Sequence, residues 1–275
     1  HQVFATDHPR TQGVDDLAQV LGRISQSAVA DGFRETDLPA TGRAPLLLLQ
    51  REGETAAAPR IYLSAGIHGD EPAGVAAMEL GFAEGLFASD FHWTLFPALN
   101  PGGLSRGTRE GLDGLDLNRD YARRQTAEVA THAGWLDQQG PFDLAVCLHE
   151  DWEASGFYLY EKPAEGSMPL GPGVVEALDR IGLSIERAGT IDGHPAEGGV
   201  IYPSHPRLED DRVADPSHPL LREGDVPEAL LLWERHHAHL FTLETPSSLP
   251  REKRCRMHLT ALRFLLSVFR YGRES

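Results

Sequence analysis

Short apolar runs alternate along this chain with segments whose apolar residues recur at helical spacing. Runs of strand length lie at 44–50, 60–67, 92–99, 143–150, 157–161 and 239–245. Helical spacing is found at 72–87, 124–138, 172–187, 227–236 and 250–270. Alternating strands and helices predict an α/β fold, here a three-layer α/β/α sandwich around a mixed, largely parallel sheet. The length of 275 residues alone permits one large or two small domains; we expect one domain over residues 1–275, with residues 1–15 as a flexible start.

The charge of the chain argues against two classes of partner. Asp and Glu number 41 against 25 Lys and Arg, which gives a formal net charge of -16. Such a field repels nucleic acid and anionic lipid, so we expect neither nucleic acid nor a membrane as a partner. The polar first residues lack the pattern of a signal peptide, no apolar run is long enough to cross a bilayer, and two cysteines make no disulfide framework. These features predict a cytoplasmic protein and give no indication of its oligomeric state.

Polar side chains stand just past four of the predicted strands. In an α/β sheet, ligands bind at the carboxyl ends of the strands, so these positions are the candidates for a site. The candidates are His68 and Glu71 after 60–67, Arg109, Asp116, Asn118 and Arg119 in a long predicted loop at 103–121, His149 at the end of 143–150, and Glu244 at the end of 239–245. We therefore expect two histidines and several carboxylates to converge on one edge of the sheet.

His68, Glu71 and His149 form a donor set that suits zinc. A catalytic zinc takes three protein ligands and keeps a fourth position for water, and two histidines with one glutamate are a common solution. Taken alone, Glu71 could instead be a carboxylate favoured by the dipole at the start of the 72–87 helix. The second histidine at another strand end favours the metal interpretation.

The remaining candidates have the chemistry of a hydrolase. Glu244 ends an otherwise apolar strand, which suits a partly desolvated general base; the alternative is a strand glutamate that faces solvent. Arg109 and Arg119 could stabilise an oxyanion and hold a substrate carboxylate, although a single arginine is more often a surface ion-pair partner. Asn118 could add a hydrogen bond to the substrate, and Asp116 could accept one from the free ring nitrogen of a ligand histidine.

Six short motifs follow one another along the chain: HGDE (68–71), NPGG (100–103), GTR (107–109), DLNRD (116–120), LHE (148–150) and TLET (242–245). In this order the chain resembles the zinc carboxypeptidase family and its relatives, the succinylglutamate desuccinylase and aspartoacylase type deacylases. The resemblance implies a carboxypeptidase-like α/β/α fold with one catalytic zinc. It also implies the role of each residue: metal ligands His68, Glu71 and His149, oxyanion-stabilising Arg109, carboxylate-gripping Asn118 and Arg119, Asp116 behind the first histidine, and Glu244 as general base and acid.

Two activities share this machinery. We expect first a metallocarboxypeptidase that acts on a peptide with a free terminal carboxylate; the alternative is a deacylase of a small N-acyl amino acid. A peptidase needs an open groove, whereas a deacylase needs a lidded cavity, and the long segment 189–226 could form such a lid. A third hypothesis is a non-catalytic metal- or peptide-binding module, whose mark would be a missing base or ligand, and none is missing.

Other features have no assigned role. Tyr160 and Tyr202 are candidates for the tyrosine that closes over substrate in the digestive carboxypeptidases. Glu150, Asp151 and Glu153 form an acidic cluster beside His149. This cluster could attract a basic substrate group or hold a second metal ion, and a solvated acidic turn is the simpler interpretation.

Overall fold

A computed structural model describes residues 16–203, 208–209, 212–213 and 225–271. The flexible start predicted at residues 1–15 lies outside the described residues, and so does part of the long segment 189–226. No helix in the described part of the chain combines the length and the apolar character that a membrane span requires.

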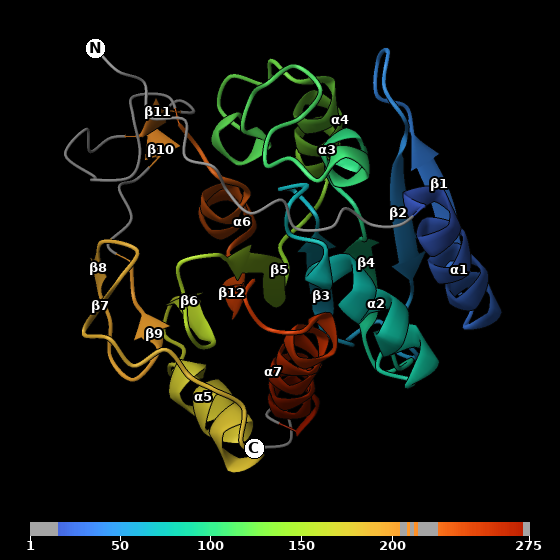
Figure 1. The fold of residues 1–275 in the computed structure, drawn as a ribbon. Coiled ribbons are helices and arrows are strands. Elements are labelled where there is room, and N and C mark those ends of the chain that lie inside the picture. The colour runs from blue at the N-terminus through green and yellow to red at the C-terminus, as the bar shows by residue number, and fades with distance from the viewer. Residues whose placement is uncertain (1–15, 204–207, 210–211, 214–224, 272–275) are drawn as a thin grey trace, which may run out of the picture.

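One mixed sheet of eight strands spans the molecule in the order β1-β2-β4-β3-β5-β12-β6-β9 (Figure 1). Its strands are β1 (Arg34–Leu38), β2 (Leu46–Arg51), β3 (Arg60–Ala65), β4 (His92–Phe96), β5 (Leu144–Asp151), β6 (Tyr158–Lys162), β9 (Val200–Ile201) and β12 (His239–Pro246). The central strands β4, β3, β5 and β12 are parallel, while β2 and β6 run antiparallel to the strands they flank. The carboxyl ends of β3, β5 and β12 therefore meet at one edge of the sheet.

Helices cover both faces of this sheet. They are α1 (Leu17–Ala30), α2 (Ala73–Ala83), α3 (Pro101–Arg106), α4 (Ala127–Leu136), α5 (Gly171–Arg180), α6 (Glu228–His236) and α7 (Arg251–Tyr271). The helices α1, α2, α5 and α7 pack on one face, and α4 and α6 pack on the other (Figure 1). The predicted α/β/α sandwich around a mixed, largely parallel sheet is confirmed.

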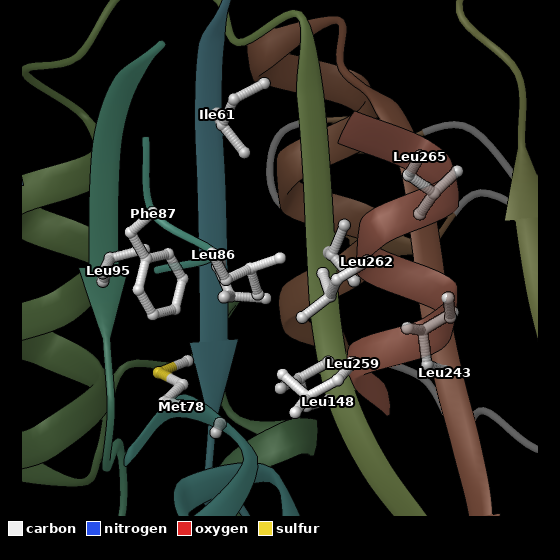
Figure 2. Packing of buried hydrophobic residues seen from close by; sticks show 14 of the residues in the cluster. Ile61, Met78, Leu86, Phe87, Leu95, Leu148, Leu243, Leu259, Leu262 and Leu265 are labelled. Carbon is white, nitrogen blue, oxygen red and sulfur yellow. The ribbon is translucent and has the colours of Figure 1, made fainter. Parts of the chain in front are cut away.

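The two-residue period of the strands divides the core between the two faces. On β5, Leu144, Val146 and Leu148 belong to the cluster with α2 and α7, whereas Ala145 and Cys147 belong to the cluster with α4 and α6. Figure 2 shows the first cluster, where leucines of α7 approach the leucines of β5 and β12. By the same alternation, His149 and Glu150, which follow one another near the end of β5, point to opposite faces of the sheet.

The HGDE and NPGG motifs form two turns that lie against each other. Gly69 approaches the backbone of Gly103 so closely that a Cβ atom at residue 69 would lie 1.9 Å from the Gly103 carbonyl carbon. Asn100 caps the short helix α3, because its side-chain oxygen accepts a hydrogen bond from the Gly103 N–H at 2.8 Å. The turn that carries His68 and Glu71 is thereby fixed by a segment that follows another strand.

The structure corrects two parts of the sequence analysis. Residues 103–121, predicted as one long loop, contain most of α3 and a 3-10 turn at Leu117–Arg119. Two glycines inside α3 hide its helical signal, since glycine is a poor helix former. No element was predicted over 17–38, where α1 and β1 lie. The spacing of Leu17, Val20, Ile24 and Ala28 is helical and could have indicated α1, whereas β1 is a polar edge strand with little hydrophobic signal.

Candidate active site

The predicted site residues meet where β3, β5 and β12 end. His68 and Glu71 lie in the turn between β3 and α2, and His149 lies near the end of β5. Glu244 on β12 is the direct neighbour of His149 across the parallel pair of strands. Asn118 and Arg119 come from the 3-10 turn that precedes α4. Sheet register and two connecting segments therefore bring together residues that are up to 176 positions apart, from His68 to Glu244.

His68, Glu71 and His149 form a compact buried cluster. The Nδ1 atom of His68 lies 2.6 Å from Oε1 of Glu71, and Nδ1 of His149 lies 2.8 Å from Oε2 of the same carboxylate. One ligand atom from each residue lies within 4.8 Å of the others. Among the residues that the structure describes, this is the one set of His, Cys, Asp and Glu near enough to hold a metal ion. Two imidazole nitrogens and a carboxylate are a donor set that zinc accepts.

The charge of the cluster also suits a cation. The charges of His68 and His149 and their hydrogen bonds overcome the effect of burial and hold the pKa of the Glu71 carboxyl far below its usual range. Burial opposes the protonation of His68, but Glu71 and Asp116 outweigh it and raise the pKa of His68 to about 8. A buried carboxylate that favours a positive neighbour this strongly is a place where a divalent cation can replace protons. The residues present therefore fit a metal ion.

Asp116 orients the first histidine. Its Oδ1 atom lies 3.1 Å from Nε2 of His68 and also accepts the Asn118 backbone N–H at 2.9 Å. A proton held on Nε2 toward this carboxylate leaves the Nδ1 lone pair directed at Glu71, which is the form that binds a metal. Burial favours the neutral acid, but His68 and Arg109 hold the pKa of Asp116 far below its usual range.

Arg109 places a guanidinium beside the cluster. Its Nε donates to Oδ2 of Asp116 at 3.1 Å, and its Nη1 lies 3.5 Å from Oε1 of Glu71. The side chain remains 41% exposed, so part of the guanidinium faces the open side of the site. It is therefore positioned to donate hydrogen bonds to a group that sits over the cluster.

Asn118 and Arg119 line the same cavity from the 3-10 turn. The Asn118 side-chain oxygen accepts the backbone N–H of Glu228 at 2.9 Å, which fixes the orientation of the amide. This bond leaves the amide nitrogen as the donor that can serve a ligand. Arg119 donates through Nη1 to the Asn118 carbonyl at 2.8 Å. The two side chains offer adjacent N–H donors, which is the chemistry that a carboxylate needs.

Glu244 reaches the cavity from β12. Burial, together with the negative charges of Glu71 and Asp151, raises the pKa of the Glu244 carboxyl well above its usual value. A cation at the cluster would offset the charge of Glu71 and lower this pKa again, because an opposite charge favours the ionised form. Glu244 is thus a carboxyl group whose protonation state responds to the occupancy of the cluster.

The cavity has a volume of about 530 Å³ and continues along the sheet past Glu244. Its floor is made by residues that share a face of β12 and β6: Glu244, Thr242 and Leu240 beside Tyr158, Tyr160 and Lys162. Asp192, His194 and Pro203 from the segment 189–226 also line the cavity. A space of this size accommodates a ligand of small-molecule dimensions.

Some residues in or near the cavity had no role predicted from the sequence, or had a different one. Tyr160, one of the two candidate tyrosines, lines it and donates to Asp192 at 2.6 Å, whereas Tyr202 is 44% exposed and lines a separate hollow. No sequence pattern indicated that Asp192 would line the cavity. The acidic stretch after His149 is not one solvated turn, because Glu150 is buried and pairs with Arg254.

Part of the chain matches a protein-family model. Residues 57–170 match the model of the succinylglutamate desuccinylase/aspartoacylase catalytic domain. That stretch contains every predicted site residue except Glu244. None of the curated proteins matches the chain.

Solved structures resemble the whole described fold. A candidate metallopeptidase of Shewanella amazonensis has a TM-score of 0.74 and 22% identity, over 92% of this chain and 93% of that one. Its counterpart from Shewanella denitrificans has a TM-score of 0.73 and 21% identity, over 92% and 90%. A metallo-carboxypeptidase of Pseudomonas aeruginosa, in complex with (2-guanidinoethylmercapto)succinic acid, has a TM-score of 0.59 and 17% identity, over 90% and 68%.

At these identities the structural likeness concerns the fold, and the match to the family model concerns the segment that carries most of the site. Together they confirm the resemblance seen in the sequence motifs. The chain therefore has a fold similar to that of the metallo-carboxypeptidases, and its residues 57–170 match the succinylglutamate desuccinylase/aspartoacylase catalytic domain.

Proposed function

We propose that this protein is a zinc-dependent hydrolase that cleaves an amide bond next to a free carboxylate. The observation that carries the proposal is the convergence of two histidine Nδ1 atoms on both oxygens of Glu71, at the edge of a cavity that Arg119 and Glu244 also line. The cluster supplies three protein ligands, and the cavity beside it leaves access for water and substrate.

His68, Glu71 and His149 would hold the zinc ion. A zinc ion bound there would supply a Lewis acid that polarises the scissile carbonyl and makes the attacking water more acidic. Asp116 keeps the His68 ring in the tautomer and orientation that this binding needs.

The other residues act on the substrate. Arg119 and Asn118 hold the free carboxylate and so place the neighbouring amide bond over the cluster. Glu244 takes a proton from the attacking water while the water oxygen bonds to the carbonyl carbon. Arg109 donates hydrogen bonds to the carbonyl oxygen as it gains negative charge. The carbon–nitrogen bond then breaks, and Glu244 returns its proton to the leaving nitrogen, which yields an acid and an amine.

Release of a carboxy-terminal residue from a peptide is the first candidate for this reaction. The cavity continues past Glu244 along Thr242 and Tyr160, so it has room for a side chain beyond the amide bond. The solved structures that resemble the whole described fold include metallo-carboxypeptidases.

Deacylation of a small N-acyl amino acid is the second candidate. It is supported by the match of residues 57–170 to the desuccinylase/aspartoacylase model. It is also supported by Asp192, His194 and Pro203, which add to the cavity a wall from the segment that could form a lid.

Both candidates are tested in one experiment. The zinc-loaded protein is assayed side by side on peptides with free carboxyl termini and on N-acyl amino acids, with Glu244→Gln as the control. We expect turnover of one class, loss of turnover after amidation of the substrate carboxylate, and a control variant that binds zinc without turnover. Hydrolysis that is unaffected by Glu244→Gln would refute the assigned base, and zinc binding without any turnover would indicate a non-catalytic binding module.

A further inference from the structure

Glu150, the residue after His149, points to the face of the sheet opposite the cavity. On β5, His149 points toward the cavity, and the two-residue period directs Glu150 toward α2 and α7. The Glu150 side chain has no exposed surface, although it carries a carboxylate. A buried carboxylate needs partners for both of its oxygens, so its contacts indicate what it does.

Glu150 closes the turn that carries the carboxylate ligand. Its Oε1 atom accepts the backbone N–H of Ala73, the first residue of α2, at 2.5 Å. Its own backbone N–H donates to Oε2 of Glu71 at 3.1 Å. Glu71 lies two residues before Ala73, so Glu150 holds both the side chain of the ligand and the backbone that follows it.

Arg254 of α7 completes the arrangement. Its Nη1 forms a short ion pair with Oε2 of Glu150, and the Arg254 side chain is only 9% exposed. Its Nε is buried without a hydrogen-bond partner. Buried ion pairs of this kind contribute little net stability, because desolvation offsets most of the attraction. Stability alone therefore does not account for this pair at this position.

We propose that Glu150 and Arg254 form a clamp that positions Glu71 and thereby sets the affinity of the cluster for its metal ion. Glu150 acts through Glu71 and Ala73, and Arg254 acts by holding the Glu150 carboxylate in place and compensating its charge. The inference rests on the metal site of the proposed function, but it does not depend on which substrate is cleaved.

The test separates positioning from charge compensation. The protein is stripped of metal, and zinc affinity is measured by competition with a chelator for the wild type, Glu150→Gln, Arg254→Met and the double variant. A glutamine at 150 can no longer satisfy both Ala73 and Arg254, so we expect zinc affinity to fall about 10- to 100-fold. Each single variant leaves one buried charge without its partner, and the double variant removes both charges. We therefore expect the thermal stability of the double variant to recover while its zinc affinity stays low.

A matched control uses the same two helices. Arg263 of α7 pairs with Glu84 at the end of α2, and both side chains are about half exposed. The variant Glu84→Gln/Arg263→Met removes this pair far from Glu71, and we expect its zinc affinity to equal that of the wild type. A similar loss in this control would assign the effect to general loosening of α2 against α7 and would overturn the clamp.

Two further outcomes are distinguishable. If the wild type binds zinc and the double variant binds it equally well, Glu150 only neutralises Arg254; the clamp is then wrong and the proposed function stands. If the wild type binds no zinc, the metal site itself is wrong, and both proposals fall.

Discussion

His132 on α4 belongs to a series of buried hydrogen bonds behind the site, and its titration provides a quantitative test of them. Its Nδ1 lies 2.7 Å from the Tyr121 hydroxyl, and its Nε2 lies 3.0 Å from the Tyr62 hydroxyl, which donates to Glu228. A neutral ring satisfies both contacts, since Nδ1 accepts from Tyr121 and Nε2–H donates to Tyr62. The Glu228 backbone N–H donates to the Asn118 side-chain oxygen. These buried hydrogen bonds therefore support one of the two residues proposed to hold the substrate carboxylate.

The expected change in unfolding free energy with pH follows from the pKa of His132. Burial lowers it from 6.5 to about 3. Because the folded-state pKa is depressed, the stabilisation is complete above pH 6.5 and is lost as the pH falls from 6.5 toward 3. Each pH unit inside that window costs about 1.4 kcal/mol of unfolding free energy. Integrated from pH 7 to pH 5, the contribution of His132 is about 2 kcal/mol.

The perturbation is His132→Gln, measured by urea unfolding of the metal-free protein at pH 7, 6 and 5. The variant loses hydrogen bonds to two tyrosines, so we expect it to be about 1–3 kcal/mol less stable than the wild type at pH 7. The wild type then loses about 2 kcal/mol more than the variant between pH 7 and pH 5, so the difference narrows. Effects of other groups, including His68, cancel in this comparison. A difference that stays constant to within about 0.5 kcal/mol across this range would refute the assignment of a buried neutral His132.

Three further predictions concern single residues. Arg119→Met should raise KM about 10- to 100-fold with little change in kcat, because it removes a charged contact to the bound carboxylate; a fall in kcat at unchanged KM would contradict this role. Asp116→Asn should weaken zinc binding about 10-fold, measured by chelator competition, because it alters the hydrogen bond that orients His68; unchanged affinity would exclude that role. Gly69→Ala should lower the unfolding free energy by at least about 2 kcal/mol, since the new Cβ would meet Gly103 at 1.9 Å; unfolding at the wild-type urea concentration would show that the two turns are not in contact.

Much of the sheet and the approximate place of the site were predictable from the sequence. The apolar runs that became β3, β5 and β12 are buried strands of strong signal, and each is followed or ended by a polar residue of the site. Once these strands are parallel neighbours, their carboxyl ends must lie together. His68 and Glu71 could be recognised as a pair from the sequence because they lie close together in one turn.

The parts that the sequence did not reveal depend on contacts between distant segments. Glu150 was grouped with Asp151 and Glu153 as an acidic cluster, yet strand alternation places it on the face opposite His149. The partner that makes its burial tolerable is Arg254, 104 residues away in the chain. Nothing in a single sequence pairs such positions. The walls of the cavity from Asp192 and His194 were hidden for a related reason, because their segment has no periodicity that predicts where it packs.

The central claim is that His68, Glu71 and His149 form a zinc site. The most direct measurement is the zinc content of the purified protein, determined for the wild type and for His68→Ala/His149→Ala. The account predicts about one zinc ion per chain in the wild type and none in the double variant. A double variant that folds and retains stoichiometric zinc would contradict it.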